Sequence, residues 1–192
     1  MPNVTYVRPC GGEETLGAWI YALTTVTANT SPTMISVARD PVAPVPHTDR
    51  LKVLRGAYVI DDVADADLTL VSCGSSLCHA VDSARNLRGE GLKRRIVSCP
   101  SFDLFDRQER EYRESVFRLD GKPIVSVEEY VATTWARYVT ASIGMSGFGY
   151  SASSKINYAR FGLDVEGIVK RVKGYLAFLN GGDARKVGWQ AL

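Results

Sequence analysis

Apolar residues recur with two different spacings along this chain, and the two spacings alternate. Short apolar runs, such as those at 68–73 and 96–99, are typical of buried strands. Other stretches carry apolar residues three and four positions apart, as in 165–179, which is typical of helices. Strands alternating with helices predict an α/β fold with a mostly parallel, Rossmann-like sheet and flanking helices.

The remaining elements follow from the same two patterns. Besides 165–179, helices are expected over 13–23, 74–87, 102–105, 110–116 and 133–139. Further strands are expected over 34–37, 57–60, 124–127 and 143–148, the last of these a Gly-rich edge strand. In the first helix Leu16, Trp19, Ile20 and Leu23 fall on one face, which is the pattern of a helix that packs against a core.

A proline-rich segment divides the chain. Pro41, Pro44 and Pro46 lie within residues 40–48, and such a density of proline excludes both a helix and a central strand. We therefore predict a helix–strand fragment and linker over 1–48, and the α/β domain over 49–192. A lone interior strand in the fragment would leave both edges unpaired, so it must pair with another polypeptide or fold against the second domain.

Composition narrows the classes of function. The chain has 192 residues and a net charge of +2, which argues against nucleic acid as the main partner. No stretch approaches the roughly 18 apolar residues of a membrane span, and Met1-Pro2-Asn3-Val4 does not begin a signal peptide. The four cysteines and two histidines lack the spacing of a zinc site. We expect a cytoplasmic protein that binds neither membrane nor metal by itself.

Several short sequence motifs occur along the chain in the order found in one known family. They are Val7-Arg8-Pro9 with Glu13 and Trp19, Ile35-Ser36-Val37-Ala38-Arg39, Gly56-Ala57-Tyr58-Val59-Ile60, Leu70-Val71-Ser72-Cys73-Gly74-Ser75, Arg95-Ile96-Val97-Ser98-Cys99-Pro100, Tyr112-Arg113-Glu114-Ser115-Val116 and Gly147-Phe148-Gly149. Together they resemble the transketolases, from the end of the pyrimidine-binding domain through the C-terminal domain. The resemblance implies that 1–48 is a remaining segment of the pyrimidine-binding domain with a linker. It also implies that 49–192 is the C-terminal domain.

One branch of the family is closer than the others. Cys99 and the turn Glu128-Glu129-Tyr130 resemble the dihydroxyacetone synthase branch. Fungal peroxisomal members of that branch end in a tripeptide with a central base, whereas this chain ends in Gln190-Ala191-Leu192. Peroxisomal targeting is therefore not carried over, although a peroxisomal location is left open.

The family's cofactor machinery has no counterpart in these residues. The metal-binding Asp and Asn, the glycine-rich diphosphate site, the glutamate at the aminopyrimidine and the channel histidines are all unmatched. We assign no catalytic, cofactor-binding or metal-binding residue to this chain. Thiamine diphosphate and magnesium would belong to an assembly with an N-terminal transketolase-like chain, acting on a sugar phosphate or a small ketose and aldehyde.

Arg39 is the candidate substrate-binding residue. In the family the arginine that ends this strand contacts the substrate phosphate, and a guanidinium can pair with two phosphate oxygens. The following residue, Asp40, also allows a local ion pair, which would weaken anion binding.

The turn Gly74-Ser75-Ser76 is a weaker candidate. Between a strand and a helix, its N–H groups could bind an anion. It lacks the lysine and the spacing of a phosphate-binding loop, so a tight turn and helix cap is the simpler interpretation.

Two hypotheses of function follow. The first is the C-terminal subunit of a split, thiamine diphosphate-dependent transketolase-type enzyme, which is not catalytic alone. The alternative is a non-catalytic interaction or anion-binding module that retains the fold. A truncated product without a role is a third possibility.

Overall fold

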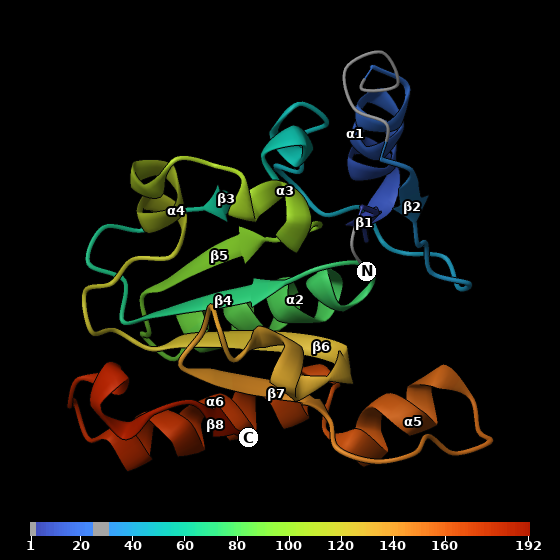
Figure 1. Ribbon diagram of the computed structural model, residues 1–192. Helices are drawn as coiled ribbons and strands as arrows, with labels where there is room; N and C mark the ends of the chain where they lie inside the picture. The colour runs from blue at the N-terminus through green and yellow to red at the C-terminus, as the bar shows by residue number, and fades with distance from the viewer. Residues whose placement is uncertain (1–2, 25–30) are drawn as a thin grey trace.

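The computed structural model describes residues 3–24 and 31–192, which form two separate sheets (Figure 1). The smaller sheet pairs β1 (Thr5–Val7) in parallel with β2 (Thr33–Ile35), and α1 (Gly11–Thr24) lies between them in sequence. The larger sheet has six strands in the order β3-β5-β4-β6-β7-β8.

The larger sheet is almost entirely parallel, as the sequence predicts. Its strands are β3 (Tyr58–Asp61), β4 (Leu68–Ser72), β5 (Arg94–Ser98), β6 (Ile124–Val131), β7 (Ala141–Met145) and β8 (Gln190–Ala191). Only β3 runs antiparallel to its neighbour, β5. The flanking helices are α2 (Ser76–Gly89), α3 (Phe102–Asp106), α4 (Arg110–Val116), α5 (Ser154–Phe161) and α6 (Val165–Leu179), with short 3₁₀ turns η1 (Lys52–Arg55), η2 (Ala132–Trp135) and η3 (Ala184–Val187).

Both faces of the central strands are buried. Leu68 and Leu70 point to the core that also contains residues of α2 and α6. Val71 and Val97 point to a second core on the opposite face, with Phe105 of α3 and residues near α4 and η2. This two-sided burial explains why β4 and β5 read as unbroken apolar runs rather than as alternating strands.

The sheet order reverses at β4. From β4 the chain passes through α2 to β5 on one side, and β6 then returns to pair with β4 on the other side. In open α/β sheets the crevice at the carboxyl ends of such strands is the usual ligand site. Figure 1 shows the smaller sheet beside this carboxyl edge, towards which β4 and β5 point.

Two predicted elements are wrong. Residues 133–139 are not a helix, because β6 leads directly into the 3₁₀ turn η2, whose Trp135 is fully buried. The expected edge strand at 143–148 ends at Met145, and β7 lies between β6 and β8 instead of at the edge. Three further elements, β1, β8 and α5, are not predicted by the sequence pattern.

The apolar stripe of α1 faces solvent, contrary to the expectation from its pattern. Leu16, Trp19 and Leu23 are 41%, 53% and 68% exposed, respectively. The buried side of α1 contains Glu14, Gly17, Ala18 and Tyr21. A Cβ on Gly17 would lie 2.3 Å from the Arg50 carbonyl oxygen, so the helix packs closely through its small residues.

The strand of the N-terminal fragment is not unpaired, because β1 and β2 pair with each other. The fragment also folds against the larger domain. The buried Glu14 carboxylate accepts hydrogen bonds from Tyr58 Oη (2.6 Å) and Ser98 Oγ (2.5 Å), which belong to β3 and β5. The division at 48/49 stays a prediction.

Candidate functional site

The crevice between the carboxyl ends of β4 and β6 is filled by an arginine of the N-terminal fragment. Arg8 follows β1, and its Nη1 lies 2.6 Å from Glu128 Oε2 while its Nη2 lies 3.1 Å from Glu129 Oε1. Its guanidinium also stacks on the Tyr130 ring, 3.8 Å from the centroid. The protein thus places its own cation where related folds bind ligands.

The pair between Arg8 and Glu128 is buried. The side chains of Arg8 and Glu128 are only 8% and 3% exposed. Burying a charge costs the free energy of its hydration, and in this pair the attraction of the opposite charge offsets that cost. If one partner were removed, the other would be a buried charge without compensation. The contact therefore joins the two sheets through a buried ion pair.

The Cys73 thiol belongs to the same cluster. It donates a hydrogen bond to Glu128 Oε2 at 2.8 Å and lies 3.6 Å from Arg8 Nη1. Burial, followed by the charge of Glu128, raises the pKa of Cys73 well above its ordinary value. A thiol that stays protonated is a poor nucleophile, so this arrangement supports packing rather than covalent chemistry.

The turn Gly74-Ser75-Ser76 lies against this cluster. Gly74 has a φ of +54°, and its N–H donates to the Arg8 carbonyl oxygen at 3.0 Å. Ser75 Oγ donates to Glu129 Oε1 at 2.8 Å, while Ser76 Oγ is buried without a hydrogen-bond partner. The Ser75 side chain thus donates its hydrogen bond to a carboxylate of the protein itself. The anion-binding role of the turn stays a prediction.

Glu129 links this crevice to a neighbouring cavity. Besides Arg8 and Ser75, its carboxylate accepts a hydrogen bond from the Tyr158 hydroxyl of α5. Burial and this hydrogen bond raise the pKa of Tyr158. The Tyr158 ring also packs on His79, with centroids 4.6 Å apart, which gives His79 a packing role.

The cavity beside Glu129 brings Arg39 together with helix α5. It has a volume of about 310 Å³, and its wall combines apolar and polar groups from the ends of β6 and β7 and from the segment 149–163. Its lining consists of Arg39, Glu129, Met145, Gly149, Ala152, Ser154, Asn157, Tyr158, Phe161 and Leu163.

Arg39 is exposed at the rim of this cavity. Among the ion pairs of the described residues none involves Arg39, so the local pair with Asp40 does not form. The guanidinium can therefore meet an anionic ligand. Gly74, Ser75 and Ser76 do not line this cavity, but Glu129, which does, accepts the hydrogen bond of Ser75 and so connects the turn with the cavity.

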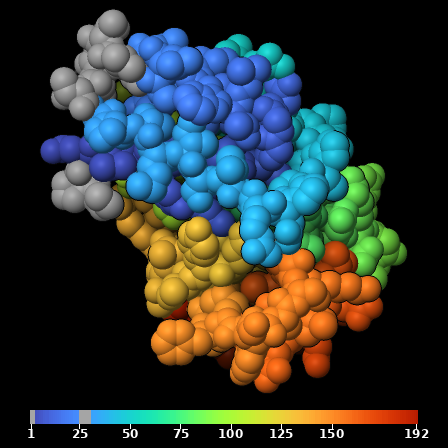
Figure 2. Space-filling model, turned by 90° about the vertical axis from the view of Figure 1, so that its right-hand side faces the viewer, coloured from blue at the N-terminus to red at the C-terminus, as the bar shows by residue number. Residues whose placement is uncertain are grey.

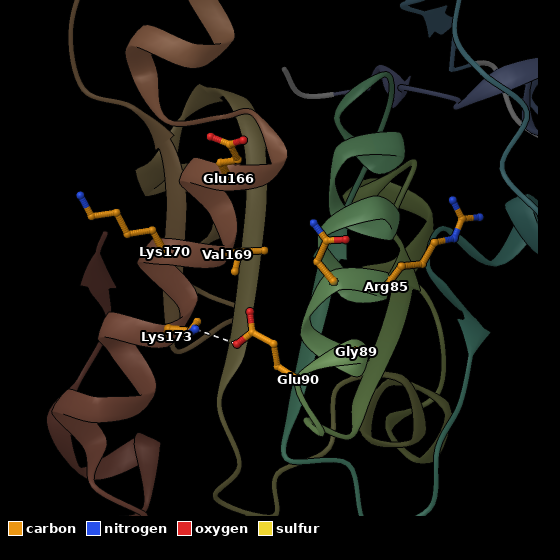
Figure 3. Close-up of a pocket in the computed structure, with 8 residues that line it drawn as sticks. Arg85, Gly89, Glu90, Glu166, Val169, Lys170 and Lys173 are labelled. Carbon is orange, nitrogen blue, oxygen red and sulfur yellow. Dashed lines mark hydrogen bonds and ion pairs between the residues drawn. The ribbon is translucent and has the colours of Figure 1, made fainter.

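A larger groove lies between α2 and α6, but its charged groups do not gather around one point. The groove has a volume of about 650 Å³. Glu90 and Lys173 pair across it at 2.7 Å, and Figure 3 shows Arg85 and Lys170 directed away from this pair. Cations and carboxylates are mixed there, which is typical of a solvated surface.

Sequence reasoning missed Arg8, Glu128 and Glu129 as members of the site. Arg8 precedes Pro9 directly after a short strand, and the two carboxylates directly follow the strand predicted at 124–127. Charged residues at the carboxyl ends of predicted parallel strands were the signal that could have identified them.

Within 3–24 and 31–192 no group of three or more His, Cys, Asp or Glu side chains could hold a metal ion. No helix in the same ranges is long and apolar enough to cross a membrane.

The sheet order, with its single antiparallel strand β3, defines an α/β domain of the doubly wound class. Residues 56–164, more than half of the chain, match the family described as "Transketolase-like TK C-terminal domain". The chain belongs to this transketolase C-terminal domain family.

Transketolases and related enzymes can be aligned with nearly the whole chain. Dihydroxyacetone synthase of Candida boidinii is 39% identical over 177 residues, which are 92% of this chain and 24% of that protein. Transketolase 1 of Escherichia coli is 35% identical over 181 residues, which are 91% of this chain and 27% of that protein. The chain thus spans about a quarter of the length of these relatives.

Solved structures agree with this assignment. The transketolase from Leishmania mexicana superposes with a TM-score of 0.87 at 38% identity, over 95% of this chain and 27% of that one. A structure described as "Split gene transketolase, inactive beta4 tetramer" shares the fold, with a TM-score of 0.72 at 21% identity. It is matched over 92% of this chain and 59% of that one.

Proposed function

We propose that this chain is the C-terminal subunit of a split, thiamine diphosphate-dependent transketolase-type enzyme. A second polypeptide supplies the cofactor, the magnesium ion and the catalytic residues, and the assembly transfers a two-carbon ketol unit in the cytoplasm. The present chain completes the fold and contributes Arg39 to the binding of a sugar phosphate.

The exposed apolar surface of the N-terminal fragment carries this proposal. We call Leu16, Trp19, Leu23, Met34 and Val37 the N-terminal apolar patch; all five are more than two-fifths exposed. Figure 2 shows the fragment (blue to light blue) forming one end of the molecule's visible face. Several large apolar side chains exposed on one helix and beside one short parallel sheet are typical of an interface.

The small sheet supports the same interpretation. β1 and β2 pair only with each other among the described strands. The outer edge of β1 is covered, because the Tyr6 N–H donates a hydrogen bond to Asp103 Oδ2 at 2.9 Å, so β2 has the edge at which a further strand could pair. A partner that carries the rest of a pyrimidine-binding domain would extend this sheet and cover the patch. The split-gene neighbour provides a precedent for a separate chain with this fold.

Co-expression with the best candidate N-terminal chain tests the proposal. We expect a stable complex and a ketol transfer activity, with thiamine diphosphate and magnesium added, that requires both chains. Trp19→Asp should weaken the complex at least tenfold, because it places a carboxylate in the apolar interface. Phe178→Asp is the matched control, since Phe178 is 62% exposed on α6, away from the patch.

The opposite result would contradict the split enzyme. A monodisperse chain that captures no partner and restores no activity would favour the alternative, a non-catalytic interaction or anion-binding module. Binding of inorganic phosphate that is lost in Ser76→Ala would then locate the anion at the turn.

Arg39→Ala tests the role of the cavity rim. In the assembled enzyme we expect the KM for a phosphorylated acceptor to rise about tenfold or more, with a small change for an acceptor without phosphate. Arg110→Ala, which removes an exposed guanidinium of α4, is the control. Equal loss for both acceptors would exclude a phosphate contact.

A further inference from the structure

Two thiols from different parts of the chain are in contact where the N-terminal fragment meets the larger domain. All four cysteines are free. Cys10 lies between β1 and α1, Cys78 lies in the first turn of α2, and their Sγ atoms are 4.0 Å apart. A disulfide has an S–S length of about 2.05 Å, so side-chain rotations that bring the sulfurs about 2 Å closer would join them.

The two thiols are unequal in ways that suit disulfide formation. Cys10 is only 1% exposed, whereas Cys78 is partly exposed to solvent. Cys78 is the third residue of a 14-residue helix, whose N-terminus stabilises a thiolate. Its hydrogen bond with Cys10 also lowers the pKa of Cys78, while the same contact and burial raise that of Cys10.

We propose that Cys10 and Cys78 form a reversible disulfide when the protein meets a hydroperoxide, and that this bond fastens the N-terminal fragment to helix α2. The proposal rests on the contact between the two sulfurs and does not depend on the proposed enzymatic function.

The reaction proceeds in two steps. The Cys78 thiolate attacks the terminal oxygen of the hydroperoxide, the O–O bond breaks, and after proton transfer a sulfenic acid and one molecule of water or alcohol are formed. Cys10 then attacks the Cys78 sulfur, its proton goes to the leaving hydroxide, and water is released with formation of the S–S bond. The two thiols lose two electrons in total, and the hydroperoxide gains them. A dithiol reverses the reaction by exchange.

The other two cysteines serve as internal controls. Cys73 and Cys99 are buried on the opposite face of the sheet, and burial raises the pKa of both thiols well above their ordinary value. Neither has a cysteine sulfur at hydrogen-bond distance among the described contacts. Oxidation should therefore be confined to one pair of thiols.

Linking residues 10 and 78 would restrict the motion of α1. This segment is attached to the larger domain by contacts that are all non-covalent, among them those of Arg8 and Glu14 and the hydrogen bond from Arg107 to Tyr21. Local unfolding breaks contacts of this kind. A covalent link beside Glu14 would make such opening rarer. The oxidised chain would thus hold the N-terminal apolar patch in one position.

Titration of the full chain with hydrogen peroxide tests the proposal. We expect the intact mass to fall by about 2 Da, the free thiols to decrease from four to two, and a peptide containing Cys10 linked to Cys78 to appear. A dithiol should restore all four thiols. Cys10→Ser and Cys78→Ser should each abolish the decrease of about 2 Da and the linked peptide, and Cys99→Ala should retain both. In Cys10→Ser the Cys78 sulfenic acid should persist and add about 16 Da.

Hydrogen exchange provides a second measurement that does not depend on the variants folding. We expect amide exchange in α1 to slow at least threefold after oxidation, with little change in α6. Accumulation of sulfinic acid at Cys78 without a linked peptide would overturn the proposal. A disulfide between two molecules in place of the internal one would also overturn it.

Discussion

At the scale of single residues, Arg8 connects the two parts of the chain. Its partner Glu128 is almost fully buried, and removing one member of such a pair leaves a buried charge. We expect Arg8→Met to lower the free energy of unfolding by about 3–5 kcal/mol, measured by urea denaturation at pH 7. The long apolar side chain of methionine keeps most of the packing volume.

An exposed pair provides the comparison for Arg8. Arg110 pairs with Glu114 at 2.6 Å on the surface of α4, where water screens the two charges and the pair contributes little. Arg110→Met should therefore change the free energy of unfolding far less than Arg8→Met. Equal effects of the two substitutions would show that burial of the Arg8 pair has no energetic consequence.

Glu14 gives stability a specific dependence on pH. Burial raises its pKa, although hydrogen bonds from Ser98, Tyr58 and the Cys10 N–H act in the opposite direction. Between the ordinary value of about 4.3 and the raised value, the folded state binds more protons than the unfolded state, so stability falls as pH rises.

The variant Glu14→Gln should lack this fall. Because the other titrating groups are shared, the stability of the natural chain relative to the variant should decrease as pH rises from 4 to 8. Urea denaturation at intervals of about half a pH unit measures this difference. A difference that stays constant or grows with pH would contradict the raised pKa.

At the scale of elements, two glycines at the ends of α2 differ in their conformation. Gly74 lies just before the helix, and Gly89 is its last residue. Gly74 has a φ of +54°, and a Cβ there would lie 3.3 Å from Arg8 Nη2. We expect Gly74→Ala to cost about 1–2 kcal/mol, since an L-residue is strained in this conformation. Gly89→Ala should be neutral or stabilising by about 0.5–1 kcal/mol, because Gly89 is helical and a Cβ there meets nothing within 4 Å.

Thermal or urea unfolding of both variants measures these effects. Opposite signs for the two glycines are the expected result. A destabilising Gly89→Ala would contradict the free space that surrounds this position.

Elements enclosed by the core were the ones predicted best. β4, β5 and α6 carry patterns that reflect burial within this chain, so their type and position agree with the structure. α5 has no buried residue and hence no apolar stripe to find. In α1 the apolar stripe predicted the helix correctly but not which side of it is buried. Sequence periodicity shows that a helix has an apolar face, but not whether that face packs within the same chain.

The site was predictable only in part for a related reason. Arg39 could be named from the resemblance, but its role remains to be tested. The Arg8–Glu128 contact joins residues far apart in sequence, and periodicity and spacing carry no information on such pairs. Only the topology of the sheet, which brings the ends of β4 and β6 together, places them in one crevice.

At the scale of the whole molecule, the N-terminal apolar patch should make the isolated chain associate with itself. Apolar area exposed in this way is removed from water when two molecules meet. We expect sedimentation velocity to show oligomers whose proportion grows with concentration over about 1–100 μM. Trp19→Asp should shift the distribution towards the monomer, and Phe178→Asp should not.

A monomer at all concentrations would mean that the patch is too small to drive association. Loss of the oligomers in Phe178→Asp alone would place the contact on α6.

The contact between Arg8 and Glu129 also spans 121 positions along the chain. During synthesis Arg8 leaves the ribosome long before Glu129, so the segment around Arg8 must wait for β6 before it can dock. Contacts of such high sequence separation form late and slowly. Until then the N-terminal apolar patch is accessible to chaperones and to neighbouring nascent chains, and a partner made at the same time could reach it before this chain has finished folding.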